Sequence, residues 1–142
     1  MSVDVRARED GVVFVREVVA EVVIDGERIC LLKRSMSVES DRGLWHYVTG
    51  HLALGSSPSS QMLIELREEL GLLPEQIRSV RSGLDLRLAD GKYLWIVHTF
   101  EVETSARDFQ LNWENDGFVW AAPVHIPDEC VTWLADVIAS IV

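Results

Sequence analysis

The sequence predicts an α+β fold in a single domain over residues 1–142. Segments typical of strands and of helices follow one another in the order strands, helix, strands, helix, which favours a layered sandwich. Two Asp-Gly pairs, Asp25-Gly26 and Asp90-Gly91, each separate two apolar segments, as turns do in β-hairpins. The length of 142 residues, with 48% hydrophobic residues, suits one domain that buries its own core.

The first group of expected strands lies before residue 50. Val12 to Ile24 is rich in valine and favours a strand. Glu27 to Lys33 is expected to return beside it after the turn at Asp25-Gly26. Ser35 to Gly43 is polar and predicts a loop, and Leu44 to Val48 predicts a short strand that leads into a loop.

The central helix is expected to begin after Ser57. Ser57 is a typical N-cap, Pro58 suits the first helical position, and Gly71 can end the helix. Its apolar positions are Met62, Leu63, Leu66 and Leu70. We expect the glutamates of this helix to lie on a different face from that apolar stripe.

The second half predicts a hairpin, one more strand and a closing helix. Arg78 to Leu88 and Lys92 to Glu103 are the expected strands around Asp90-Gly91. Phe118 to Ala122 favours a further strand, and Asp128 to Ile141 predicts a helix. The apolar positions of this last helix would be Cys130, Val131, Leu134, Val137, Ile138 and Ile141.

Three glutamates of the central helix form a pattern that suits a metal. Glu65, Glu68 and Glu69 have the spacing i, i+3, i+4 and are expected to project from one helix face. Like charges so close destabilise a bare helix, and a hard divalent cation would remove that cost because carboxylate oxygens are its preferred ligands. The alternative is an acidic helix face that is simply solvated.

The stretch from Gly50 to Leu72 resembles the Nudix box, G-x5-E-x7-R-E-U-x-E-E-x-G-U, where U is a bulky apolar residue. The matching positions are Gly50, Glu65, Leu66, Glu68, Glu69, Gly71 and Leu72, and Gly55, Ser57 and Pro58 fit the usual loop and cap. The resemblance extends more loosely from about Val18 to Ile126. It implies a Nudix-like α/β/α sandwich in which a mixed β-sheet lies between helices.

Two positions of the box depart from the family pattern. Ser56 stands where the family has a glutamate, and Ile64 stands where it has an arginine that helps to orient the catalytic glutamates. Because the glutamate and the arginine are both absent, neither is left as an unpaired charge, and we expect the fold to be unaffected. The orientation of the remaining glutamates, and with it the rate of reaction, is what these changes affect.

The resemblance implies a metal-dependent hydrolase that cleaves a diphosphate linkage in a nucleoside diphosphate derivative. Mg²⁺ or Mn²⁺ would bridge the helix carboxylates and the phosphate oxygens. Glu65 and Glu69 would be the principal ligands, and Glu68 a ligand or the general base. The carbonyl of Thr49 matches a backbone ligand of relatives, and Glu114 lies where the family often has an extra glutamate, with a solvated loop as its alternative.

Substrate contacts are expected from residues near the box. Arg34 follows an expected strand and can meet a phosphate with two hydrogen bonds. Trp45 and Tyr47 can stack on a base, as can Trp95 and Trp113, although such side chains also belong in cores. The four histidines, His46, His51, His98 and His125, show no metal-ligand spacing and are predicted not to be ligands.

Two other functions remain open from the sequence. The first is a catalytically impaired Nudix-like module that binds or senses a nucleotide, and the departures from the box at Ser56 and Ile64 favour it. The second is an enzyme like isopentenyl-diphosphate isomerase, which shares the fold family; the short chain and the lack of a reactive-cysteine motif speak against it.

Composition narrows the expected partners and location. The net charge of −10 argues against binding to a nucleic acid polymer but not against nucleotides, since cations can bridge acids and phosphates. No apolar run reaches the length of a membrane span, and the N-terminus does not resemble a signal peptide. With Cys30 and Cys130 read as free thiols, we expect a cytoplasmic protein. A homodimer is only a family-level expectation.

Overall fold

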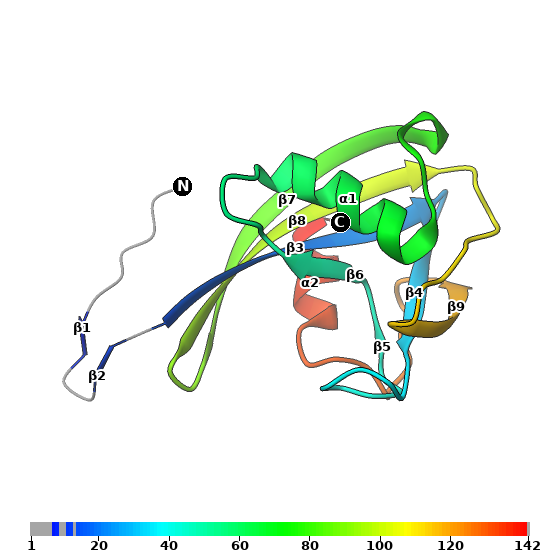
Figure 1. Ribbon diagram of the computed structural model, residues 1–142. Coiled ribbons are helices and arrows are strands. Elements are labelled where there is room, and N and C mark those ends of the chain that lie inside the picture. Colours follow the sequence, from blue (N-terminus) through cyan, green and yellow to red (C-terminus); the bar gives the residue numbers. More distant parts are fainter. Residues whose placement is uncertain (1–6, 9–10, 13, 142) are drawn as a thin grey trace.

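A mixed β-sheet between two helices forms the body of the computed structural model (Figure 1). The structure describes residues 7–8, 11–12 and 14–141. The strands of the main sheet are β3 (Phe14–Asp25), β4 (Arg28–Arg34), β5 (Trp45–His46), β6 (Val48–His51), β7 (Ile77–Asp90), β8 (Tyr93–Thr104) and β9 (Asn115–Ala121). The short strands β1 (Ala7–Arg8) and β2 (Gly11–Val12) pair only with each other in the described part of the chain.

Strand β3 is the centre of the main sheet. It runs parallel to β8, from Phe14 opposite Tyr93 to Ile24 opposite Glu103. It is antiparallel to β4 and to β6, while β7 and β9 add antiparallel strands to β8 and β4. Parallel and antiparallel pairs therefore occur in one sheet, as the α/β/α sandwich expected from the sequence requires.

The two faces of the sheet carry two separate hydrophobic clusters. Alternate residues of a strand point to opposite faces, so Val19 and Val23 pack towards helix α1 (Pro58–Leu70) while Ala20 and Val22 pack towards helix α2 (Leu134–Ile141). The helices thus cover opposite faces of β3. No described helix has the length and apolar character needed to cross a membrane.

Helix α1 has the predicted ends and a different buried face from the predicted one. Ser57 Oγ accepts from the Ser60 N–H at 3.2 Å, and Gly71 ends the helix with a left-handed φ of 66°. Leu63 was expected in the core but is exposed. The buried positions are Gln61, Met62, Glu65, Leu66, Glu69 and Leu70. The expectation that glutamates and apolar stripe occupy different faces is therefore wrong for two of the three glutamates.

The segment after the polar loop is two strands rather than one. β5 pairs with β4 and β6 pairs with β3, so the chain changes its partner at Tyr47. β6 continues through Gly50 to His51, which places Gly50 in a strand and not in the expected loop. The expected first strand agrees with β3 from Phe14 onward, and Val13 lies outside the described residues. A separate short helix, η1 (Pro74–Gln76), follows α1.

The closing helix is shorter than predicted because the residues before it bind to β5. Trp45 donates its N–H to the Glu129 carbonyl at 2.9 Å and accepts from the Val131 N–H at 3.0 Å. Cys130 forms an isolated parallel bridge with Trp45. These backbone groups are used between segments, so helix α2 begins only at Leu134.

Candidate functional site

Helix α1 places two glutamates of the acidic motif inside the protein. Glu69 is completely buried and Glu65 has 8% of its surface exposed, whereas Glu68 is exposed. The i, i+4 spacing aligns the buried pair on one side of the helix. A solvated acidic face is therefore wrong for Glu65 and Glu69 and describes only Glu68. Burial of carboxyl groups is costly, and such groups are often found at functional sites.

The carboxyl group of Glu69 is held by one side chain and by the backbone. Asn115 Nδ2 donates to Glu69 Oε1 at 3.2 Å, and the Thr49 backbone forms a further hydrogen bond. Burial, followed by the charges of Glu114 and Glu65, raises the pKa of Glu69 well above its ordinary value. The second oxygen, Oε2, is buried without a hydrogen-bond partner.

The carboxyl group of Glu65 lies between Gln61 and Gly50. Gln61 Nε2 donates to Glu65 Oε1 at 2.8 Å. A Cβ atom on Gly50 would collide with the Glu65 carboxyl group, so the box glycine is needed here for close approach. Burial raises the pKa of Glu65, and the charge of Glu68 adds to that rise.

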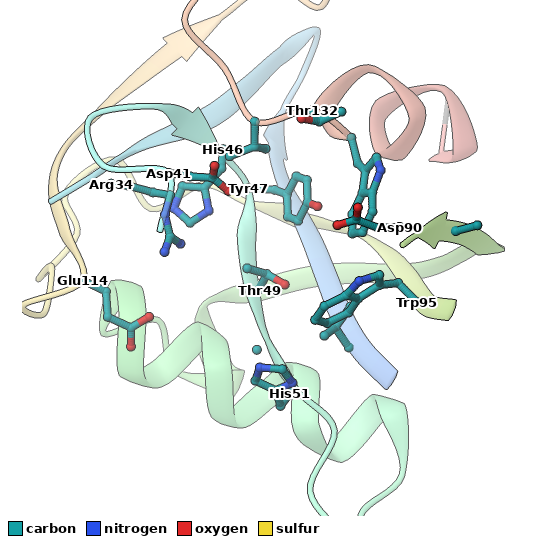
Figure 2. A pocket seen from close by; sticks show the side chains of 15 residues that line it. Arg34, Asp41, His46, Tyr47, Thr49, His51, Asp90, Trp95, Glu114 and Thr132 are labelled. Carbon is teal, nitrogen blue, oxygen red and sulfur yellow. The ribbon is translucent and has the colours of Figure 1, made fainter. Parts of the chain in front are cut away.

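Glu114 faces the same site from the segment before β9. It is half-buried, its charge raises the pKa of Glu69, and it lines the cleft described below together with Thr49. Figure 2 shows the Glu114 side chain beside helix α1. The structure thus brings Glu114 and Thr49 near the buried glutamates of the box, with Glu114 in a turn where it is half-buried and still reaches solvent.

A buried histidine is connected to this site through Asn115. His46 Nε2 lies 2.7 Å from Asn115 Oδ1, and the side chains have 2% and 4% of their surface exposed. Burial lowers the pKa of His46 to about 4, so the ring is neutral at neutral pH. Sequence spacing offered no sign of this contact, because the two residues are 69 positions apart.

Glu21 is a buried acid that we did not predict for the site. It lies on β3, is completely buried, and neither of its carboxyl oxygens has a hydrogen-bond partner. Burial, then the charges of Glu69 and Glu65, raises the pKa of Glu21 well above its ordinary value. The signal for it was a single acid inside the apolar run from Val18 to Val23.

The donor chemistry of the site fits a hard divalent cation. Glu65, Glu68, Glu69 and Glu114 offer oxygen ligands only, and one Glu69 oxygen lacks any partner. Within the described part of the chain, no three His, Cys, Asp or Glu side chains stand close enough to hold an ion as they are placed. Joint binding therefore requires Glu68 or Glu114, both of which reach solvent, to turn towards Glu69.

A cleft of about 600 Å³ is lined by Thr49, Gly50 and Glu114, which also lie next to the buried glutamates of the box (Figure 2). Its lining includes Arg34, Tyr47, His51, Trp95 and Trp133. It combines aromatic faces with one guanidinium group, which suits a ligand that has a ring and an anionic part. Burial raises the pKa of Tyr47 to about 12, so its hydroxyl group stays neutral.

The predicted substrate residues divide into two groups. Arg34 and Tyr47 line the cleft, whereas Trp45 does not and packs instead with the hydrophobic cluster beside α2. Trp95, which was also expected to be able to stack on a base, lines the cleft. Trp133 also lines the cleft and was not predicted, because it lies within the predicted closing helix, far in sequence from the box.

The two altered box positions lie at the protein surface. Ile64 has 46% of its surface exposed, and Ser56 is half-buried with its N–H donated to the Ala53 carbonyl at 3.0 Å. A charged pair at these positions is therefore not required for packing. The buried carboxyl groups Glu65 and Glu69 have other partners in this chain, namely Gln61 and Asn115.

Comparison with solved structures identifies the fold. The chain is similar to a MutT NUDIX hydrolase from Burkholderia pseudomallei, with a TM-score of 0.75 and 15% identity over 89% of this chain and 97% of that one. A MutT protein from Methanosarcina mazei Go1 gives 0.72 and 17%, covering 89% and 92% of the two chains. The NUDIX domain of Shewanella oneidensis NrtR, complexed with ADP ribose, gives 0.70 and 15%, covering 87% and 84%.

These similarities show that the protein has the Nudix fold, which confirms the fold predicted from the box. No protein-family model matches the sequence. No curated protein matches it either. At identities of 15 to 17%, the similarity identifies the fold, and the chemistry has to be argued from the site itself.

Proposed function

We propose that the protein is a metal-dependent hydrolase that cleaves the diphosphate linkage of a nucleoside diphosphate derivative. The observation that carries this proposal is the buried pair Glu65 and Glu69, which lies against Gly50 and Thr49 in the lining of a cleft that also contains Arg34 and aromatic side chains. Among solved structures of the same fold, one is complexed with ADP ribose, and another is an Ap4A hydrolase from C. elegans.

In this proposal the carboxyl groups of α1 hold Mg²⁺ or Mn²⁺. Glu65 and Glu69 are the principal ligands, and Glu68 is a ligand or the general base that takes a proton from water. The Thr49 carbonyl and Glu114 complete the set. When bound, the cation neutralises phosphate charge and makes water a better nucleophile.

The cleft supplies binding and orientation of the substrate. Arg34 donates hydrogen bonds to a phosphate oxygen, and its Nε is already held by the Ser40 carbonyl at 3.0 Å. Among the other lining residues, Trp95 and Tyr47 present aromatic surface to a base or ribose. Trp45 has no part in this binding mode, because it does not line the cleft.

A hydrolysis screen tests the proposal. Nucleoside diphosphate sugars, dinucleoside polyphosphates and nucleoside triphosphates are incubated with Mg²⁺ or Mn²⁺, and the products are separated by chromatography. We expect cleavage of at least one diphosphate class, its loss with a chelator, and its loss in Glu69→Gln. No cleavage of any class by the wild-type protein, or equal cleavage by Glu69→Gln, would contradict the proposal.

A binding module without turnover is the second candidate, and the departures at Ser56 and Ile64 favour it. One protein of this fold, the NUDIX domain of Shewanella oneidensis NrtR, is complexed with ADP ribose in its solved structure. Calorimetry with ADP ribose separates the two candidates. Heat of binding with an unchanged ligand afterwards supports the module, and conversion of the ligand supports the enzyme.

The proposed setting follows from the same properties. Both cysteines are free thiols, with Cys30 buried and Cys130 half-buried, which suits a reducing compartment such as the cytoplasm. The proposed partner is a small nucleotide-type molecule and not a nucleic acid polymer, because the net charge is −10. A homodimer is part of the proposal only as a general expectation, which light scattering would test.

A further inference from the structure

Each buried glutamate of α1 is held by a neutral amide that is itself held by another donor. Gln61 Nε2 donates to Glu65 Oε1 at 2.8 Å, and Gln61 Oε1 accepts from the Ala53 N–H at 3.2 Å. A half-turn of this amide would set its NH₂ group against the Ala53 N–H, and that hydrogen bond would be lost. The Gln61 amide is therefore fixed in the orientation that serves Glu65.

The same arrangement occurs at Glu69. Asn115 Nδ2 donates to Glu69 Oε1 at 3.2 Å, and Asn115 Oδ1 accepts from His46 Nε2 at 2.7 Å. With its NH₂ group on Glu69, Asn115 presents its oxygen to the ring, and an amide oxygen can only accept a hydrogen bond. His46 then carries its proton on Nε2, and the order of donation runs from His46 through Asn115 to Glu69.

We propose that Gln61, Asn115 and His46 are positioning residues that orient Glu65 and Glu69 in place of a charged arginine–glutamate pair. The inference rests on the function proposed above. Ser56 and Ile64 leave the box without its charged pair, while the two carboxyl groups that matter most each have a buried amide donor. The three positioning side chains come from α1, β5 and β9, so the fold itself sets their distances.

The three positioning side chains are buried, unlike polar side chains that lie at the surface because water solvates them. Gln61, Asn115 and His46 have 6%, 4% and 2% of their surface exposed. Burial of such polar groups is tolerated when they are hydrogen-bonded, and each has its partner here. Apolar residues would fill the same space without that requirement. Gln61, Asn115 and His46 share one feature, which is that the hydrogen bonds they form lead to a carboxyl group of α1.

Mn²⁺ binding measures the positioning without any reaction. Free Mn²⁺ is followed by electron paramagnetic resonance during titration of the wild-type protein, Gln61→Met and Asn115→Leu, which keep side-chain size and remove the donor. Loss of groups that orient metal ligands typically lowers affinity by about 10- to 100-fold, and we expect a loss in that range. Gln76→Met is the matched control, because Gln76 is exposed and its amide bonds only the Leu73 N–H among the contacts described.

The relay through Asn115 makes a stricter prediction about His46. His46→Phe should weaken Mn²⁺ binding, while His46→Gln, which keeps an N–H donor, should restore most of it. His46→Phe combined with Asn115→Leu should bind no more weakly than Asn115→Leu alone, because His46 acts only through Asn115. Additive losses, or equal binding by wild type, Gln61→Met and Asn115→Leu, would overturn the inference.

A second readout keeps this inference separate from the proposed function. The side-chain amide protons of Gln61 and Asn115, assigned by their disappearance in the variants, are followed by NMR without metal. Slow exchange with solvent, and faster exchange of the Asn115 signal in His46→Phe than in His46→Gln, are expected. If the wild-type protein neither binds Mn²⁺ nor hydrolyses a diphosphate, the proposed function fails. Fast exchange in the wild-type protein overturns the positioning role itself.

Discussion

The neutral state of His46 leads to a quantitative prediction for acid stability. The ring is buried, and burial lowers its pKa from an ordinary value of 6.5 to about 4. In the unfolded chain the ring therefore takes up a proton at a higher pH than in the folded protein. Stability rises with pH wherever the unfolded state binds more protons, so this contribution is complete above pH 6.5 and is lost as the pH falls towards 4.

The size of the effect follows from the two pKa values. Each pKa unit of difference between folded and unfolded states corresponds to about 1.4 kcal/mol, so His46 accounts for a loss of about 3 kcal/mol across this pH range. His46→Gln keeps an N–H donor for Asn115 and has no titrating ring. It should therefore lose about 3 kcal/mol less than the wild-type protein on acidification.

Urea unfolding of both proteins at about pH 7.5 and about pH 4 gives the comparison. The carboxyl groups that also titrate in this range are common to both proteins, so their contribution cancels in the difference. A free-energy difference between wild type and His46→Gln that is the same at both pH values would refute the reasoning. It would mean that the His46 ring is protonated in the folded protein as readily as in the unfolded chain.

Three further predictions concern the helix and its surroundings. Leu66→Ala should cost about 2–5 kcal/mol in urea unfolding, because Leu66 is completely buried, and the control Leu63→Ala should cost far less. Gly50→Ala should leave the fold intact but weaken Mn²⁺ binding in a titration, because the new Cβ displaces the Glu65 carboxyl group; unchanged binding would contradict the placement of Glu65. Glu21→Gln should raise the melting temperature without metal at neutral pH, since the raised pKa of Glu21 makes its contribution to stability fall as the pH rises. That gain should fade towards pH 4.5, and a constant gain would contradict the sign.

The parts of the fold that depend on local chemistry were predictable from the sequence. Ser57 and Gly71 mark the ends of α1 because capping needs only neighbouring residues. The turns at Gly26 and Gly91 have left-handed φ values of 61° and 59°, as the Asp-Gly pairs indicated. The acidic spacing within α1 also follows from helix geometry alone.

The parts that depend on distant partners were not predictable. The closing helix is short because residues before Leu134 bind Trp45 across the fold, and no local pattern carries that information. Helical spacing predicted that Leu63 lies in the core. The buried side of α1 in the structure includes Glu65 and Glu69 instead. The contact between His46 and Asn115 joins residues 69 positions apart, so only the folded chain reveals it.

The burial of the acids shows how the site differs from its sequence pattern. From spacing, the three glutamates of the box were equivalent, and either all solvated or all metal-binding. The structure separates them, because the sheet covers Glu65 and Glu69 while Glu68 remains in solvent. Glu21 adds a third buried acid from β3 that belongs to no part of the motif. The charges of Glu69 and Glu65 help to raise the pKa of Glu21, after burial, because β3 packs against α1.

The metal dependence of diphosphate cleavage tests the central claim most directly. Wild-type protein and Glu69→Gln, purified in parallel, are titrated with Mn²⁺ at a fixed concentration of each nucleoside diphosphate derivative of the screen, and the released nucleotide is measured. Our account predicts that for at least one derivative the rate rises with Mn²⁺ and saturates in the wild-type protein and is absent in Glu69→Gln. Saturable binding of Mn²⁺ and of a derivative with no release of nucleotide from any of them, or the same rate in both proteins, would contradict it.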